Sequence, residues 1–150
     1  MIIETLALGK LDVQNEQIYQ FPKGIPGFDD ENEFAMITLE EGPFSYLQSL
    51  KDTRISFLIS DPFVFYPAYE FELPESDAEE LGITESVIVR CIVTINEQTQ
   101  IDLTTINLLA PIVLNPLNKQ GKQVVLHNSP YRTKHLLWPD KSEVTEKDGD

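Results

Sequence analysis

The chain has 150 residues with 11 basic and 25 acidic side chains, which gives a formal net charge of −14 at pH 7. That charge disfavours direct nucleic-acid binding, because phosphate neutralisation dominates such affinity, and it favours a basic protein partner. The single cysteine excludes an internal disulfide and is typical of a reducing cytosol. The first residues, Met-Ile-Ile-Glu-Thr, contain no basic region and no long apolar run, so a secretory leader is not expected. No run approaches the roughly 20 apolar residues of a membrane helix. We therefore expect a cytoplasmic protein without a membrane partner.

Short apolar runs separated by turn residues predict an all-β domain. Strands are expected over residues 2–8, 17–21, 34–39, 44–50, 55–60, 87–95 and 123–127, with a hairpin connection at 96–100. This spacing favours a single antiparallel β-barrel-like domain over residues 1–139. Residues 140–150 are charged and almost free of apolar side chains, which predicts a disordered tail.

One short helix is expected near residues 76–81. Acidic residues occupy its first turn, where they suit the helix dipole, and Gly82 follows it as a stop signal. The remaining regular structure is predicted to be strand.

Residues 104–115 are apolar at most positions, on both alternating faces of an extended chain. A strand with this pattern is buried on both sides. Pro111 disfavours a helix and interrupts a central ladder, so we expect a bulge, a bend or a locally unpaired edge there. Asn107 and Asn115 bracket the run, where their amides would bond backbone groups freed by the interruption.

Two segments rich in proline and aromatic residues are irregular. Residues 21–28 hold two prolines and two glycines among apolar side chains, which favours a structural loop pinned to the core over a ligand-binding loop. Residues 61–74 hold three prolines and five aromatic side chains. The prolines indicate an edge or an irregular extended path. Phe63, Phe65 and Phe71 favour the core, whereas either a core or an interface suits Tyr66 and Tyr69.

The charges are unevenly distributed. No Lys or Arg occurs between Arg54 and Arg90, and no Asp or Glu occurs between Asp102 and Asp140. The acidic stretch is either a solvated face or a docking surface for a basic protein, and the adjoining aromatics make it a candidate site. The candidate partner-binding residues are Tyr66, Tyr69, Glu70, Glu72, Asp77 and Glu80, with Asp29, Asp30 and Glu31 as a second patch.

Residues that would carry catalysis or bind a metal are not arranged in any familiar motif. His127 and His135 lack metal-ligand spacing, and Cys91 lies on an apolar strand face, where a buried thiol is expected rather than a reactive one. There is no dinucleotide-binding or phosphate-loop motif. We expect a binding protein, not an enzyme, with no cofactor and no metal.

Five stretches, taken together and in order, resemble the FliW family of flagellar assembly factors. They are Phe21-Pro-Lys-Gly-Ile-Pro-Gly-Phe28; Tyr46-Leu-Gln-Ser49; Asp61-Pro-Phe63 with Pro67-Ala-Tyr-Glu-Phe71; Asn107-Leu-Leu-Ala-Pro-Ile-Val113 with Asn115; and Gly121-Lys-Gln123 with Ser129-Pro-Tyr-Arg132 and His135. The chain departs from the family pattern at Ala68, where an acid is frequent, and at Tyr46, where Trp is frequent.

The resemblance implies a β-barrel-like cytoplasmic protein without catalytic activity that binds two proteins. One is flagellin, and the other is CsrA, a basic RNA-binding regulator that represses flagellin mRNA. It implies a partner switch, in which accumulating flagellin captures the factor and frees the regulator. An acidic body docked beside an RNA site would also repel phosphate within about 8 Å at physiological salt.

Two alternatives stay open at the level of the residues. One is a small β-barrel enzyme, for example a flavin-dependent one, with a cleft lined by Tyr66 and Tyr69. The other is a structural interaction domain of a larger complex that is unrelated to motility.

Overall fold

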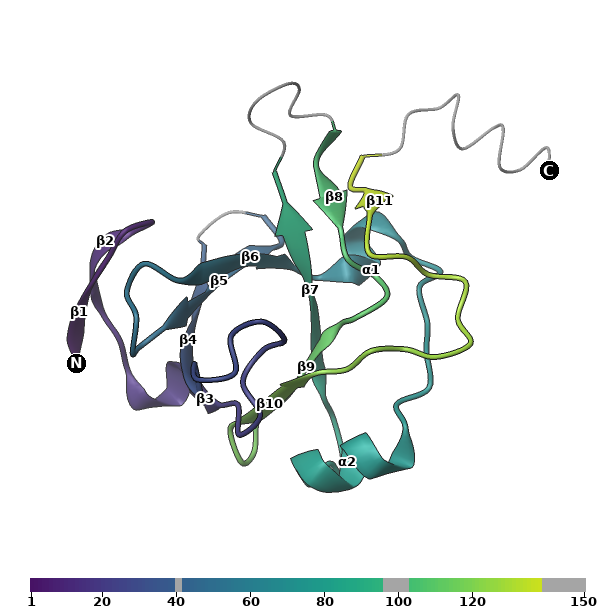
Figure 1. Ribbon diagram of the computed structural model, residues 1–150, viewed down its shortest axis with the longest axis horizontal. Helices are drawn as coiled ribbons and strands as arrows, with labels where there is room; N and C mark the ends of the chain where they lie inside the picture. The colour runs from purple at the N-terminus through teal and green to yellow at the C-terminus, as the bar shows by residue number, and fades with distance from the viewer. Residues whose placement is uncertain (40–41, 96–102, 139–150) are drawn as a thin grey trace.

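The computed structural model describes residues 1–39, 42–95 and 103–138 (Figure 1). Strands make up most of its regular structure. The elements are β1 Ile2–Thr5, β2 Gly9–Asp12, the 3-10 turn η1 Asn15–Gln17, β3 Ile18–Gln20, β4 Glu33–Thr38, β5 Phe44–Ser49, β6 Ser56–Ser60, α1 Pro62–Phe65, α2 Glu75–Leu81, β7 Ile88–Thr94, β8 Thr105–Ile106, β9 Ile112–Asn115, β10 Gln120–Gln123 and β11 His135–Leu136.

Seven of these strands close into a barrel. The sheet runs in the order β7-β6-β5-β4-β3-β10-β9, and β9 pairs again with β7 to complete the ring. Neighbouring strands are antiparallel except β3 and β10, which meet in parallel at a single residue pair, Gln20 with Gln120. The expected β-barrel-like fold is therefore confirmed. β8 and β11 extend the sheet beyond β7, and β1 and β2 form a separate hairpin.

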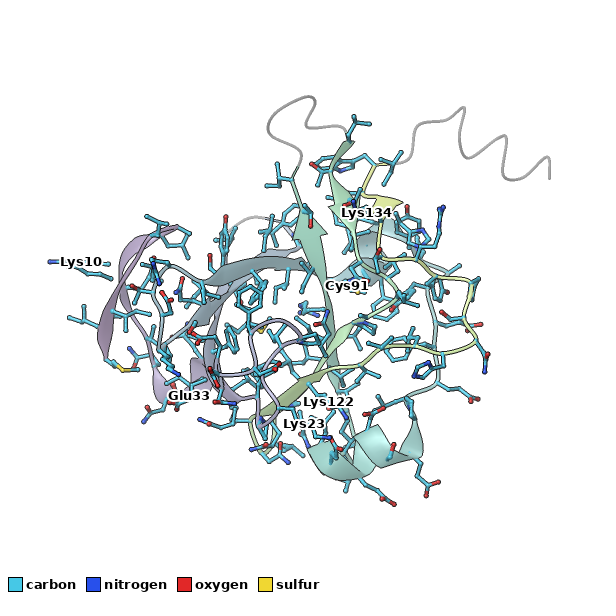
Figure 2. The ribbon with its side chains drawn as sticks, in the orientation of Figure 1. Lys10, Lys23, Glu33, Cys91, Lys122 and Lys134 are labelled. Atoms are coloured by element: carbon cyan, nitrogen blue, oxygen red, sulfur yellow. The ribbon has the colours of Figure 1, made fainter. Side chains whose placement is uncertain are left out.

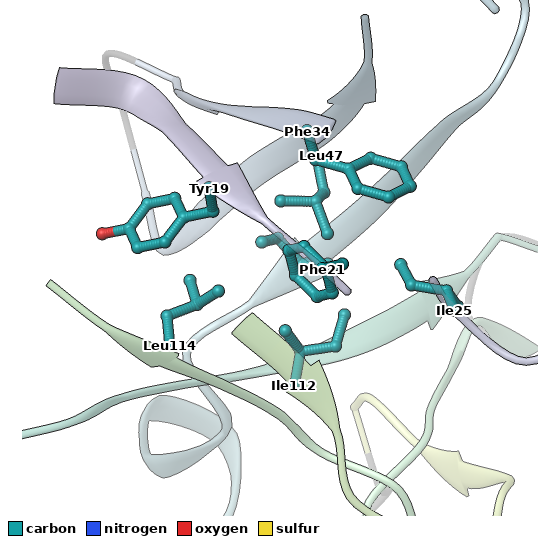
Figure 3. Packing of buried hydrophobic residues seen from close by; sticks show 8 residues of the cluster. Tyr19, Phe21, Ile25, Phe34, Leu47, Ile112 and Leu114 are labelled. Carbon is teal, nitrogen blue, oxygen red and sulfur yellow. The ribbon is translucent and has the colours of Figure 1, made fainter. Parts of the chain in front are cut away.

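The barrel interior is filled by apolar side chains from opposite walls and from the loop at residues 21–28 (Figure 3). Phe21 is fully buried and meets the Phe34 ring edge-on at 5.2 Å between centroids. Ile25, farther along the same loop, is 2% exposed. Gly24 has a φ of +66°, and a Cβ there would lie 2.7 Å from backbone atoms of Asp29. The loop is therefore a structural plug, as its prolines and glycines predicted.

The buried run at residues 104–115 has the expected interruption. β8 ends at Ile106, and β9 begins directly after Pro111. In the gap, Asn107 Oδ1 accepts hydrogen bonds from the Leu109 and Ala110 amides at 3.1 and 3.0 Å. Asn115 Nδ2 donates to the carbonyls of Leu81 and Gly82 at 2.9 and 3.2 Å. Asn107 therefore satisfies backbone amides at the interruption, as expected. Asn115 instead satisfies carbonyls at the end of α2, outside the strand ladder.

Three local expectations are corrected. The strand expected over residues 2–8 ends at Thr5, whose hydroxyl donates to the Gly9 carbonyl and turns the chain into β2. The last long strand lies at Gln120–Gln123, not at residues 123–127, because it pairs with β9 along its whole length. The irregular segment after β6 begins with one helical turn, α1, in addition to the expected helix α2. The expected hairpin connection at 96–100 and the expected tail at 140–150 lie outside the described residues.

Candidate protein-binding groove

A groove of about 760 Å³ lies between two irregular segments of the chain. One wall is the stretch that leads into α2, from Glu70 to Glu75, and the other is the stretch after β10, from Leu126 to Tyr131. The Tyr131 hydroxyl accepts a hydrogen bond from the Glu70 amide at 3.1 Å, which ties the two walls together at one end. The groove therefore contains the centre of the candidate acidic and aromatic segment.

Carboxylates gather on one wall of this groove. Glu70, Glu72 and Glu75 are exposed, and none of them forms an ion pair within the described part of the chain. His127 lies on the opposite wall. Glu70 and Glu72, predicted as partner-binding residues, thus lie together on an open surface with their charge available to a cationic partner.

The other two acids of the candidate site are engaged internally. Lys122 of β10 binds Asp77 of α2 and also Glu80 at 2.8 Å, and Lys23 of the plug loop binds Glu80 at 2.7 Å. Figure 2 shows Lys23 and Lys122 side by side next to α2. Hydrogen bonds from the two lysines lower the pKa of Glu80 to about 2. Burial alone would lower the pKa of Lys122, but its bonds to Asp77 and Glu80 outweigh burial and raise it. This cluster holds α2 to the barrel.

Replacing Lys122 by methionine is expected to destabilise the protein at pH 7 more than at acid pH. The folded-state pKa of Glu80, about 2, lies below its ordinary value of 4.5. Its contribution to stability is therefore present above about pH 4.5 and is lost as the pH falls toward 2. Thermal melts of wild type and variant between pH 7 and about pH 2.5 should show the gap in melting temperature closing on acidification.

Lys134→Met is the matched control for this experiment. Lys134 is exposed and has no ion pair within residues 1–39, 42–95 and 103–138. Its replacement therefore changes the net charge as Lys122→Met does but leaves the cluster of Lys122, Asp77 and Glu80 intact. The difference in melting temperature between Lys134→Met and wild type should be smaller than that of Lys122→Met and should depend less on pH. A Lys122→Met gap that stays constant from pH 7 to acid would contradict the role of the cluster.

The two candidate tyrosines are attached to the body of the protein. Tyr69 is 4% exposed, and its hydroxyl donates to the Leu108 carbonyl at 2.8 Å. Burial raises the pKa of this phenol above its ordinary value. Tyr66 is half-buried, and its hydroxyl donates to the Leu136 carbonyl of β11. Tyr69 therefore anchors residues 61–74 to the core and offers almost no surface to a partner. A flavin-dependent enzyme with a cleft lined by Tyr66 and Tyr69 would need this side chain to be accessible, and it is buried.

The aromatic side chains around Tyr69 divide between core and surface. Phe65 and Phe71 are half-buried and pack against the core, whereas Phe63 is 42% exposed. The expectation that Phe63 belongs to the core is wrong, because it lies on the outer side of the single helical turn α1.

The second acidic patch lies on the connection between the plug loop and β4. Asp29 and Asp30 are exposed, but Glu31 is only 7% exposed and accepts a hydrogen bond from the Ser49 hydroxyl at 2.6 Å. Ser49 Oγ in turn accepts from the amides of Lys51 and Asp52. Glu31 is therefore a structural group that fixes the turn after β5, and only the two aspartates offer surface charge.

Groups capable of other chemistry are inaccessible or dispersed. Cys91 is fully buried, and burial raises the pKa of its thiol to about 12, as expected for a structural cysteine. Within the described residues, no three His, Cys, Asp or Glu side chains are grouped so that they could hold a metal. No helix in those ranges has the length and apolarity needed to cross a bilayer. A second pocket, of about 260 Å³, is almost wholly apolar and is lined in part by Phe44, Tyr46 and Trp138.

By its fold and its surface, this is a small closed β-barrel with an acidic groove. Comparison with known proteins agrees: the FliW protein family model matches residues 2–137. The chain is 44% identical over 138 residues to a flagellar assembly factor FliW from Bacillus pumilus, with 91% of this chain and 96% of the relative covered. It is 43% identical to the Bacillus subtilis protein of the same name, with the same coverage. The chain belongs to the FliW family.

A solved structure supports the same placement. The crystal structure of a flagellar assembly factor FliW superimposes with a TM-score of 0.87 at 39% sequence identity, covering 94% of this chain and 99% of that one. The resemblance inferred from the five sequence stretches is thus confirmed at the level of family and fold.

Proposed function

We propose that this protein is a cytoplasmic flagellar assembly factor without enzymatic activity that binds flagellin and the translational regulator CsrA. Membership of the FliW family over residues 2–137 carries the proposal, since the relatives from Bacillus pumilus and Bacillus subtilis are both named flagellar assembly factors. The charge supports the second partner. A protein of net charge −14 suits an RNA-binding regulator, which must itself be basic to bind phosphates.

The proposed mechanism is a switch between partners. While flagellin is scarce, the protein holds the regulator and flagellin mRNA is translated. When flagellin accumulates, it captures the protein, and the freed regulator represses the message. The groove with Glu70 and Glu72 is the proposed docking surface for the regulator, because these carboxylates are exposed and unpaired within the described residues.

Electrostatic repulsion explains how docking at this surface antagonises RNA binding. Charges act over about 8 Å at physiological salt, so an acidic body bound beside an RNA site repels phosphate without occupying that site. Antagonism should therefore weaken as salt is raised, even under conditions in which the protein complex stays intact.

The proposal is tested by calorimetry with purified partners. We expect the protein to bind CsrA and expect added flagellin to dissociate that complex. Persistence of the complex at saturating flagellin would rule out the switch, because capture would then not release the regulator. Absence of binding to both proteins would refute the proposed function altogether. Refolded wild-type protein checked by circular dichroism serves as the control for sample integrity.

A further inference from the structure

The segments that border the groove, residues 70–75 and 124–131, begin with the exposure pattern of extended backbone. Exposure alternates along both: Glu70 and Glu72 are exposed while Phe71 and Leu73 are half-buried, and Val125 and His127 are exposed while Val124 and Leu126 are buried. The inward side chains of both walls pack in the same apolar cluster, around Leu81 and Val113. An alternation of period two is the mark of extended backbone.

One of these walls has an unpaired edge. The amides of Val124 and Leu126 donate to the carbonyls of Pro111 and Leu109, each at 2.9 Å. In extended backbone the intervening amides point to the opposite edge. Those of Val125 and His127 have no hydrogen-bond partner in the described part of the chain, and no backbone hydrogen bond joins the two walls there. Of these two residues, His127 also lines the groove, so one free amide belongs to a residue of the groove wall.

The carboxylates on the wall formed by residues 70–75 indicate which kind of partner the groove would bind. Glu70 and Glu72 are two positions apart on one side of an extended segment, which separates them by roughly 7 Å along the chain. A second extended chain presents its alternate side chains at the same spacing. Lys or Arg at positions i and i+2 of such a chain therefore match the two carboxylates, whereas the basic residues of a helix recur at i+3 and i+4.

We propose that the groove binds an extended segment of a protein partner with Lys or Arg at alternate positions. The backbone of the segment adds as a strand beside Val125 and His127, and its cationic side chains pair with Glu70 and Glu72. Strand addition supplies affinity through the main chain, and the alternating charges supply specificity. The inference rests on the proposed function and specifies how the basic partner is recognised.

The test uses a fluorescein-labelled nine-residue peptide, Thr-Lys-Val-Lys-Thr-Lys-Val-Lys-Thr, and the full-length protein, with binding followed by fluorescence anisotropy. A peptide of equal composition with its four lysines grouped, Lys-Lys-Lys-Lys-Thr-Val-Thr-Val-Thr, is the pattern control. We expect the alternating peptide to bind at least about 5-fold more tightly, because only it places cations opposite both carboxylates. Equal affinity for the two peptides would overturn the proposal.

Two further arms separate the charge from the backbone. Glu70→Gln with Glu72→Gln is expected to weaken the alternating peptide about 5-fold, which corresponds to two exposed ion pairs of ordinary strength. The double change Glu79→Gln with Glu85→Gln removes the same charge from exposed positions outside the groove and should leave affinity within about 2-fold. Two further versions of the alternating peptide carry N-methyl groups, one at both valines and the other at the lysines. In an extended peptide the valine amides and the lysine amides point to opposite edges, so only one set can bond the protein backbone. At least one of the two methylated peptides should therefore fail to bind. Equal losses in both double variants, or full binding of both methylated peptides, would overturn the inference.

Failure of this inference is distinguishable from failure of the proposed function. If the regulator binds wild type and the Glu70→Gln, Glu72→Gln variant equally while neither peptide binds, the groove is excluded and the function stands. If the alternating peptide binds with the expected pattern but the regulator does not, the groove stands and the proposed partner is wrong.

Discussion

Replacement of Phe21 by alanine is expected to lower the free energy of unfolding by about 3–5 kcal/mol, the usual loss for a buried phenylalanine. The Phe21 ring is fully buried in the cluster of side chains inside the barrel. A Cβ on Gly121 would lie 2.6 Å from this ring, so the ring is closely packed on that side. Its loss leaves a cavity that the closed ring of strands cannot collapse to fill. Urea unfolding followed by tryptophan fluorescence and circular dichroism gives the change directly.

Phe63→Ala is the matched control for this experiment. Phe63 is 42% exposed and makes one tilted ring contact with Tyr69 at 5.7 Å between centroids. Its loss should cost less than about 1.5 kcal/mol. Comparable losses at Phe21 and Phe63 would show that the loop at residues 21–28 is not a plug and that the barrel is stable without it.

Replacement of Asn115 by leucine is expected to cost about 2–4 kcal/mol, since unsatisfied buried polar groups cost about 1–3 kcal/mol each. The side chain is 2% exposed and bonds the last carbonyls of α2, while its Oδ1 accepts from the Leu117 amide at 3.0 Å. Leucine has a similar volume but satisfies none of these groups. The free energy of unfolding in urea measures the loss, and amide exchange in α2 should accelerate.

Asn118→Leu provides the comparison at the same place. Asn118 Nδ2 also donates to the Leu81 carbonyl at 2.9 Å, but the residue is exposed, so water replaces the lost bond. Less than about 1 kcal/mol is expected. If Asn118→Leu were as harmful as Asn115→Leu, burial would not explain the importance of Asn115.

The central strands were predictable because their patterns and their turns agree. β4, β5, β6 and β7 each lie within one residue of the expected bounds, and so does α2. Gly42 with its φ of +84° marks one of the turns between them. Where apolar alternation, turn residues and burial point to one structure, local sequence suffices.

The predicted bounds of secondary structure are wrong where a side-chain hydrogen bond or pairing with a distant strand determines the backbone conformation. Leu6, Ala7 and Leu8 continue an apolar run, but the hydroxyl of Thr5 accepts from the Leu8 amide at 2.8 Å and builds a turn instead. Gln120–Gln123 has little strand propensity of its own, and its pairing with β9 makes it a strand. The helical turn α1 had a readable signal: Asp61 caps it through the Phe63 amide, with Pro62 at the first position.

The candidate site was predictable only in part, because charge along a sequence does not reveal ion pairs across a fold. The acidic stretch and the basic stretch were separate features of the sequence, yet Lys122 meets Asp77 and Glu80 in the structure. Glu70 and Glu72 keep their charge unpaired within the described residues. Glu31 was predicted as surface and lies buried, since nothing in its neighbours indicates the hydrogen bond from Ser49.

The parallel contact between β3 and β10 also determines when the barrel can form. Gln20 and Gln120 meet there although they are far apart in sequence, and β9, which closes the ring on β7, ends only at Asn115. A growing polypeptide therefore carries β3 and β7 with open edges until most of the chain has left the ribosome. Such non-local closure slows folding and exposes strand edges to neighbours. We therefore expect incomplete chains of this protein to associate with one another more readily than completed ones.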